Sequence, residues 1–96
     1  MNEIKEYTEK LFEDIKHIDE NENEYWLARE LMPLLEYSKW ERFSNTIENA
    51  KIACENSEYD VSNHFPNIGK MVQIGSKTNR QIIDYKLSRY ACYLIV

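Results

Sequence analysis

The sequence has few of the residues that form linkers, disulfide scaffolds or zinc sites. Its 96 residues include only two glycines, two prolines and two cysteines. With so little glycine and proline, no stretch reads as a flexible linker, so we expect one domain, residues 1–96, with one modest core. The cysteines, Cys54 and Cys92, are too few and too far apart for a disulfide scaffold or a zinc site. We expect both to be reduced and to pack as small hydrophobic residues.

Long apolar runs are also missing. No segment approaches the roughly 20 apolar residues of a transmembrane helix, and the charged N-terminal segment has no signal-peptide h-region. Hydrophobic residues nevertheless make up 43% of the chain, which argues against disorder. These features predict a globular cytoplasmic protein without a membrane partner.

The charges are unevenly placed along the chain, whose net charge is −5. Residues 1–24 hold nine acidic residues against three lysines, a balance of −6. Residues 67–96 hold five basic residues against one acidic residue, a balance of +4. An acidic isoelectric point argues against nucleic-acid binding. The basic C-terminal third weakens that argument, because a local field is enough to attract a polyanion.

Hydrophobic spacing predicts an α+β fold. Residues 2–15 place apolar residues at helical steps, with acids early in the segment where the helix dipole favours them. Two short runs on either side of "ENEN" predict a β-hairpin, with Asn21 and Asn23 supplying the left-handed conformations of its turn. Residues 27–37 predict a second helix, which Pro33 shortens or kinks.

The clearest predicted element is a helix of about four turns over residues 39–55, which ends near "ENS". Ser38 and Glu41 have the spacing of a capping box. Only a turn around Glu36–Tyr37 separates this helix from the previous one, so the pair predicts a helix–turn–helix-like corner. One apolar stripe, at steps of three and four, should face the core: Trp40, Phe43, Ile47, Ala50 and Cys54.

The C-terminal third predicts a second short β-hairpin and a last helix. The turn "GSKTN" should join two strands, one with Met71, Val72 and Ile74 and the other with Ile82, Ile83 and Tyr85. Ser88 is the expected N-cap of the last helix, with Leu87 packed against Cys92 as a hydrophobic staple. The fold class is therefore a small α+β domain with a helix–turn–helix-like corner and two short hairpins.

No catalytic or metal-binding set stands out. His17 and His64 have no cysteine or carboxylate at metal-ligand spacing, and we expect His17 on a strand and His64 in a loop. The sequence contains no glycine-rich phosphate loop and no G-x-S-x-G or H-E-x-x-H motif. We expect no enzymatic activity, no cofactor and no metal ion.

A binding surface is the better candidate for function. Helix–turn–helix proteins read DNA with the N-terminal part of their second helix, where Arg can pair with guanine and Asn with adenine. Ordinary polar surface is the alternative interpretation, and Glu41 and Glu48 on the same helix favour it. The residues on the side away from the apolar stripe are Lys39, Arg42, Asn45, Thr46 and Asn49.

The C-terminal third offers phosphate contacts. The turn over residues 76–80 resembles a basic wing and carries Lys77, Asn79 and Arg80. Lys86 and Arg89 follow along the chain as further candidate contacts to phosphates.

Several stretches resemble a known family. They are "EYWLARELMPLLEYSKWERF", "AKIACENS" and "DYKLSRYACYLIV", with "WLAREL" (residues 26–31) and "LSRYACYL" (residues 87–94) specific in combination. "HF" at residues 64–65 and "MVQIGS" at residues 71–76 add to them. Over residues 12–96 the chain resembles the DNA-damage-inducible protein D family. The N-terminal part of that family is similar to the BRO N-terminal domain of phage antirepressors and baculovirus repeated-ORF proteins.

The resemblance implies a DNA-associated role without catalysis, in the bacterial response to DNA damage or in phage regulation. Two features depart from the family. Glu36 stands where the family often has a helix-capping glycine, so the corner is expected to be shaped differently. Family members also continue beyond Val96, so the chain reads as the N-terminal part of a longer protein. Ile95 and Val96 should then pack on the first helix or form an apolar patch that invites a second copy.

Two hypotheses follow. The first is a DNA-binding module, with single- or double-stranded DNA left open. The second is a protein-interaction module whose acidic N-terminal helix docks on a DNA-repair or recombination protein. A homo-oligomer formed through exposed apolar surface is a third, structural alternative.

Overall fold

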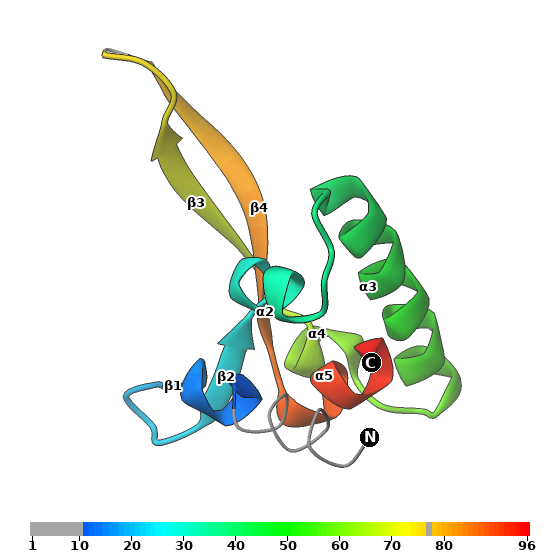
Figure 1. Cartoon of the computed structure of the whole chain (residues 1–96). Coiled ribbons are helices and arrows are strands. Elements are labelled where there is room, and N and C mark those ends of the chain that lie inside the picture. Colours follow the sequence, from blue (N-terminus) through cyan, green and yellow to red (C-terminus); the bar gives the residue numbers. More distant parts are fainter. Residues whose placement is uncertain (1–10, 77) are drawn as a thin grey trace.

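The computed structural model describes residues 11–76 and 78–96 (Figure 1). Most of the helix expected over residues 2–15 lies outside the described residues, and residues 11–14 are helical. The elements that follow are β1 (His17–Ile18), β2 (Glu24–Leu27), α2 (Ala28–Leu34), α3 (Trp40–Asn56), α4 (Val61–His64), β3 (Asn67–Gln73), β4 (Asn79–Leu87) and α5 (Arg89–Ile95). The predicted α+β class is confirmed. Among the described residues, every helix is too short or too polar to cross a membrane.

The four strands form one antiparallel sheet in the order β1-β2-β4-β3. β2 pairs only with the end of β4, through Trp26 with Leu87 and Leu27 with Lys86. β3 pairs with β4 along its whole length, from Asn67 with Tyr85 to Gln73 with Asn79. The outer part of this hairpin therefore has no third strand, and it projects from the rest of the molecule (Figure 1).

We call residues 67–76 and 78–83 the arm, and the remaining described residues the body. The second hairpin was predicted to be short, which is wrong: its strands have seven and nine residues. The prediction began the first strand at Met71 and missed Asn67–Lys70. Its first half is polar and contains Gly69, so hydrophobicity gave no signal there.

The first hairpin is confirmed, but its turn uses different residues. Glu22, not Asn21 or Asn23, adopts the left-handed conformation, with φ of 65°. The Asp19 carboxylate accepts hydrogen bonds from the backbone N–H groups of Asn21 and Asn23, both at 2.9 Å. The side chain of Asp19 thus organises the turn and determines which residue takes the positive φ.

The core lies between α3 and α5 and extends to β2, α2 and the end of β4. The predicted stripe of α3 is confirmed, because Phe43, Ile47, Ala50 and Cys54 are buried. The other members of the buried hydrophobic cluster are Trp26, Ala28, Leu31, Phe65, Tyr85, Leu87, Ala91, Cys92 and Ile95. All of these residues belong to the body, so hydrophobic burial stabilises the body far more than the arm.

The two helices of the predicted corner are present, and Pro33 lies in the last turn of the short α2. The connection takes five residues, 35–39, more than the turn at Glu36–Tyr37 that was expected. The predicted capping box at Ser38 is wrong. α3 begins one residue later, with Lys39 at the N-cap and no side-chain cap hydrogen bond.

Glu36 does not change the corner as the sequence suggested. It adopts φ of 65°, the conformation that glycine usually supplies. The N–H of Glu36 donates to Pro33 O (3.0 Å) and the N–H of Tyr37 donates to Met32 O (3.1 Å), which is the Schellman pattern. α3 ends in the same way at Glu58, also with φ of 65°. Both helices therefore keep a left-handed cap without glycine, at a local conformational cost.

The last helix, α5, has the N-cap that the sequence predicted. The Ser88 hydroxyl accepts a hydrogen bond from the N–H of Ala91 at 3.0 Å, which begins α5. Ile95 is 8% exposed and packs in the core, whereas Val96 is 82% exposed. Only one of the two terminal apolar side chains therefore remains on the surface.

Candidate nucleic-acid interface

The arm is the most distinctive surface of the structure. It is a two-stranded ribbon, and β3 lies at the edge of the sheet. Residues 67–83 contain Lys70, Lys77 and Arg80 and no acidic residue. Lys77 lies outside the described residues. The arm is thus a basic projection from an acidic protein, which is the charge distribution that a polyanion selects.

The strand register divides the side chains of the arm between two faces, since directly opposed residues point the same way. One face, called the cationic face, carries Lys70 and Arg80 with the apolar residues Ile68, Val72 and Ile82. The other, called the amide face, carries Gln73, Asn79 and Gln81 with Met71 and Ile83. Asn79 and Arg80 were predicted from the sequence as candidate DNA contacts. That prediction missed Lys70, Gln73 and Gln81, which the alternation of "NIGKMVQ" with the opposite strand would have indicated.

The base of the arm is attached to the body through Asp84, which is completely buried. Its Oδ1 accepts hydrogen bonds from the N–H groups of Arg29 (3.1 Å) and Tyr85 (2.9 Å). Its Oδ2 lies 3.7 Å from Nζ of Lys70 and has no hydrogen bond among the described residues. The Arg29 side chain donates from Nε to Ile83 O at 2.8 Å. Asp84 therefore accepts a hydrogen bond from the first turn of α2, whose N-cap residue makes no side-chain hydrogen bond of its own. The same hydrogen bond holds the base of the arm to α2.

The polar surface predicted on α3 exists, but its charges are mixed. Lys39, Arg42, Asn45 and Asn49 are all exposed. Glu41 and Glu48 are exposed on the same helix, and Glu48 pairs with Lys51 at 3.0 Å. Between Trp40 and Asn56 there are three acidic and two basic residues, a balance of −1. This surface lacks the positive field of the arm.

Arg89 has a different environment from the one we expected. Its guanidinium makes ion pairs with Glu13 at 2.8 Å and with Glu24 at 2.6 Å. The hydrogen bonds from Arg89 hold the pKa values of both carboxyl groups below their usual range, and the same bonds, first from Glu24, raise the pKa of Arg89. Lys16 lies 3.5 Å from Glu13 and joins the cluster. The charge of Arg89 is thus neutralised within the body, so the structure does not support it as a free phosphate contact.

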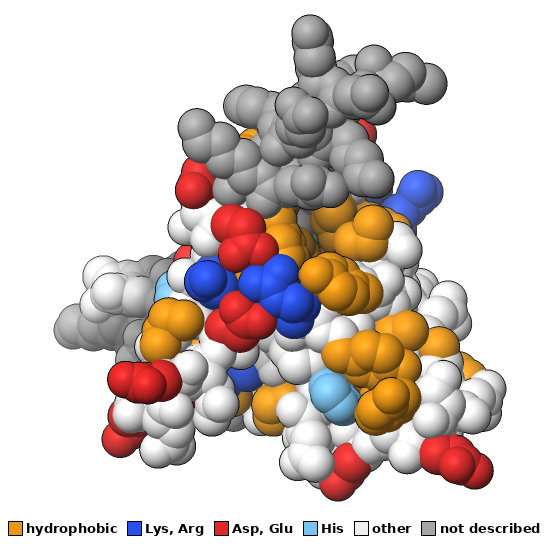
Figure 2. Space-filling model, turned by 90° about the horizontal axis from the view of Figure 1, so that it is seen from below, with side chains coloured by type: hydrophobic (Ala, Val, Ile, Leu, Met, Phe, Trp, Pro, Cys, Tyr) orange, Lys and Arg blue, Asp and Glu red, His pale blue; other side chains and the backbone are white. Residues whose placement is uncertain are grey.

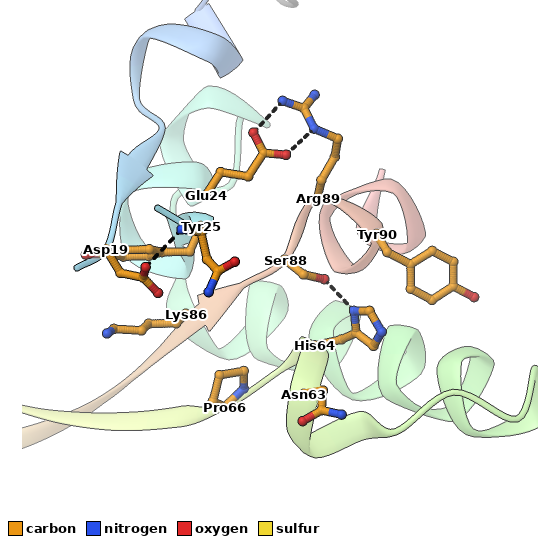
Figure 3. A pocket seen from close by; sticks show the side chains of 11 residues that line it. Asp19, Glu24, Tyr25, Asn63, His64, Pro66, Lys86, Ser88, Arg89 and Tyr90 are labelled. Atoms are coloured by element: carbon orange, nitrogen blue, oxygen red, sulfur yellow. Dashed lines mark hydrogen bonds and ion pairs between the residues drawn. The ribbon is translucent and has the colours of Figure 1, made fainter. Parts of the chain in front are cut away.

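Lys86 lines a pocket of about 480 Å³ at the end of β4, between the β1–β2 turn, α4 and α5 (Figure 3). Its Nζ lies 4.8 Å from the centre of the Tyr25 ring, and it has no carboxylate partner among the described residues. His64 also lines the pocket, and its Nδ1 lies 2.7 Å from the Ser88 hydroxyl. His64 lies in the helical turn α4 and not in a loop as predicted. Because Ser88 also caps α5, this pair is explained by the local structure.

The face around the pocket mixes aromatic and paired charged side chains (Figure 2). The rings of Tyr59, His64 and Tyr90 lie with centroids 4.7–5.8 Å apart. Beside them, Figure 2 shows a cationic cluster flanked by acidic side chains. The charge of Arg89 on this face is thus compensated by Glu13 and Glu24, whereas Lys86 lies against the Tyr25 ring.

The predicted site residues are not brought to one surface. Asn79 and Arg80 lie on the arm, Lys86 and Arg89 lie near the pocket, and the other described candidates lie on α3 (Arg42, Asn45 and Asn49) or at its N-cap (Lys39). Arg80 and Lys86 are six residues apart on one strand, about 20 Å at strand spacing. A single contact to one short DNA segment would therefore use a subset of the predicted residues.

The remaining reactive groups are structural where they are described. Burial raises the pKa of the Cys92 thiol to about 12, and burial also raises the pKa of the Cys54 thiol. Both thiols are therefore protonated at neutral pH and are poor nucleophiles. His17 lies on β1 as expected and contacts the Glu30 carboxylate at 2.5 Å. In residues 11–76 and 78–96, no group of three His, Cys, Asp or Glu residues could hold a metal ion.

Comparison with known proteins identifies relatives over most of the chain. The family model described as "BRO family, N-terminal domain" matches residues 14–96. Over 85 residues the chain is 49% identical to DNA damage-inducible protein D of Escherichia coli (strain K12), an alignment that covers 88% of this chain and 31% of that protein. The chain thus spans about a third of the length of this curated relative. No solved structure matches it.

Proposed function

Since the chain belongs to the BRO family, whose N-terminal domain it contains, we propose that it is a DNA-binding module associated with the response to DNA damage. It acts without catalysis, by binding, in the manner of an antirepressor-like regulator. In a bacterial cell it would meet its DNA in the cytoplasm. The role belongs to residues 1–96, and further activities of a longer protein would be additional to it.

The arm is the observation that carries this proposal. It is a projecting ribbon whose sequence, residues 67–83, contains Lys70, Lys77 and Arg80 and no acidic residue. Arg80 is exposed and has no ion-pair partner among the described residues. Phosphate contacts from lysine and arginine supply most non-specific affinity for DNA. The relative named for DNA damage supports the same direction, since it is 49% identical to this chain over 85 residues.

The direct test is fluorescence anisotropy with labelled duplex and single-stranded DNA of random sequence. We expect binding at low salt and a loss of affinity between about 50 and 200 mM salt, because each phosphate contact releases a counterion. A labelled acidic peptide of similar charge is the control for a general affinity for polyanions. If neither DNA is bound at the lowest salt concentration, the proposal is wrong for this chain.

A protein-interaction role is the second candidate, and the β1–β2 turn favours it. Glu20 and Glu22 are exposed on this turn. They are free to meet a basic surface of a DNA-repair or recombination protein, unlike Glu13 and Glu24, which pair with Arg89. The double variant Glu20→Gln/Glu22→Gln should then lose such a partner and keep its affinity for DNA. Co-purification with the variant in place of the wild type checks this, and an unchanged set of bound proteins would contradict it.

A further inference from the structure

We propose that the arm reads duplex DNA from the major groove, with its amide face against the edges of A·T base pairs and with Arg80 against the backbone phosphates. This inference rests on the proposed function. It adds the form of DNA, the groove, and the residues that read the bases.

The dimensions of the arm suit the major groove. Two paired strands lie about 4.8 Å apart, and the major groove, roughly 12 Å wide, admits a two-stranded ribbon, whereas the minor groove is roughly 6 Å wide. A ribbon can enter only where no other element covers it. β3 is an edge strand, and β2 pairs with β4 only beyond the arm, through Trp26 and Leu27. The arm is therefore free of neighbouring strands along its outer part (Figure 1).

The amide face has the chemistry that recognises adenine. Glutamine and asparagine side chains can donate to N7 and accept from N6 of adenine in the major groove. Asn79 and Gln81 are two residues apart on β4, so their side chains leave the same face about 7 Å from each other. This separation is close to two base-pair steps of about 3.4 Å. Gln73 lies directly opposite Asn79. Nε2 of Gln73 donates to Ser76 O at 3.4 Å, so Asn79 and Gln81 are the two amides that can face neighbouring base pairs.

Gly69 allows Gln81 to lie flat on this face. A Cβ atom at position 69 would collide with Nε2 of Gln81, so the glutamine amide occupies the space that a side chain would fill. A side chain at position 69 would have to share this face with the Gln81 amide, and glycine avoids that conflict.

The apolar residues of the amide face suit the partner base. Met71 lies directly opposite Gln81 and is 65% exposed, and Ile83 is 49% exposed. The C5 methyl group of thymine is the apolar feature of the major groove. Side chains of this kind beside an amide favour an A·T pair over a G·C pair.

The cationic residues flank the ribbon. Arg80 is exposed at the outer end of β4, so its long side chain can reach a phosphate wall of the groove, whereas Nζ of Lys70 lies 3.7 Å from the buried Asp84 carboxylate. Both lie on the face away from the amides. This arrangement separates positioning contacts to phosphates from reading contacts to bases.

The arm is poorly suited to single strands. Proteins that bind single-stranded DNA stack its bases on aromatic side chains. Residues 67–83 contain no aromatic residue. The exposed ring of Tyr59 and the partly buried ring of Tyr90 lie in the body, near the pocket at the other end of β4. Duplex DNA is therefore the form that the arm fits.

The experiment begins with selection of a preferred duplex from a random-sequence library by the wild-type chain. Its dissociation constant is then measured by anisotropy for the same duplex with adenine or with 7-deazaadenine, which lacks the N7 acceptor. We expect 7-deazaadenine to weaken wild-type binding by about 5- to 100-fold at the position that is read. The variant Gln81→Ala should lose a similar factor on the normal duplex and should no longer distinguish the two duplexes.

The matched controls lie on α3. Asn45→Ala removes an exposed amide there, as Gln81→Ala does on the arm, and Arg42→Gln removes an exposed charge, as Arg80→Gln does. Arg80→Gln should weaken binding to all sequences and lower the slope against log salt by about 1. Both α3 variants should stay within about twofold of the wild type, because the inference gives them no contact. Circular dichroism of each variant establishes that it is folded.

The outcomes separate the inference from the proposed function. DNA binding that is unchanged by 7-deazaadenine and by Gln81→Ala would overturn the inference and leave the proposed function standing. The same holds if single-stranded DNA binds more tightly, or if the α3 variants lose more affinity than the arm variants. A dimer detected by sedimentation that Met71→Arg dissociates, with DNA affinity unchanged, would assign the arm to a second copy instead. No DNA binding by the wild type would overturn both.

Discussion

The arm and the body differ in how they use the same kinds of residue. In the body, apolar side chains such as Phe43 are fully buried, and Arg89 is held by two carboxylates. On the arm, Met71 and Ile83 are exposed, and Arg80 has no carboxylate partner among the described residues. A two-stranded hairpin alone is only marginally stable. The body therefore supplies stability, and the arm offers its side chains to another molecule.

Asp84 joins the two regions. It is a buried carboxylate at the base of the arm, bonded to the backbone of α2. It also lies near Lys70, which belongs to the arm. The position of the arm relative to the body is thus set partly by one polar residue and not by hydrophobic packing alone.

The largest expected difference between the regions is in packing. Phe43→Ala should lower the free energy of unfolding by about 3–5 kcal/mol, because it leaves a cavity among fully buried side chains. Met71→Ala on the arm should change it by less than about 0.5 kcal/mol, because Met71 is mostly exposed. Urea denaturation followed by circular dichroism measures both. Equal losses would show that the arm packs against something in solution.

The next effect concerns the junction. Asp84→Ala should lower the free energy of unfolding by about 1–3 kcal/mol, because it leaves the N–H groups of Arg29 and Tyr85 without their acceptor. Asp84→Asn keeps an acceptor oxygen and should cost less. Thermal unfolding gives the stabilities, and hydrogen exchange of the arm amides shows whether the arm loosens. Protection of the arm that is unchanged in Asp84→Ala would argue against a role in holding it.

A smaller effect, of opposite sign, is expected at the helix ends of the body. Glu36→Gly and Glu58→Gly should each raise the free energy of unfolding by about 0.5–1 kcal/mol, because glycine adopts φ of 65° without the steric cost of a Cβ atom. Gly is otherwise destabilising at exposed helical positions, so Glu55→Gly in the last turn of α3 is the control and should lower stability. Chemical denaturation measures all three. Loss of stability in the two cap variants would contradict the left-handed caps.

The smallest expected effect is a difference between Arg89 and Arg80 in how the free energy of unfolding depends on pH. The Glu13 and Glu24 carboxyl groups have pKa values lowered from 4.5 by Arg89, so their contribution to stability is present above that pH. It is lost as the pH falls through the lowered values, because the unfolded chain binds protons first. Arg89→Gln should therefore flatten the acid side of the stability curve, whereas Arg80→Gln should leave it unchanged. Since the carboxylates are partly exposed, the effect is small, and denaturation midpoints measured at several pH values detect it.

Parts of the fold could be predicted because their signals are local. The stripe of α3 needs only the spacing of Phe43, Ile47, Ala50 and Cys54, and Ser88 caps a helix within three residues of itself. The arm was harder, because its length depends on how two strands pair and not on their hydrophobicity. The start of α3 was missed for a related reason: Ser38 has the right spacing for a cap, but the chain enters the helix one residue later.

The candidate site could also be predicted only as far as local sequence allows. The sequence by itself determined the α+β class, the family, and a basic C-terminal third with Arg80 and Arg89 both among the candidates. Only the tertiary structure decided between them. It brings Glu24 and Glu13, which lie 65 and 76 residues earlier in the chain, against Arg89 and neutralises it. It leaves Arg80 exposed on a ribbon without acidic residues. Charge belongs to the residue, but its availability depends on which distant residues the fold places beside it.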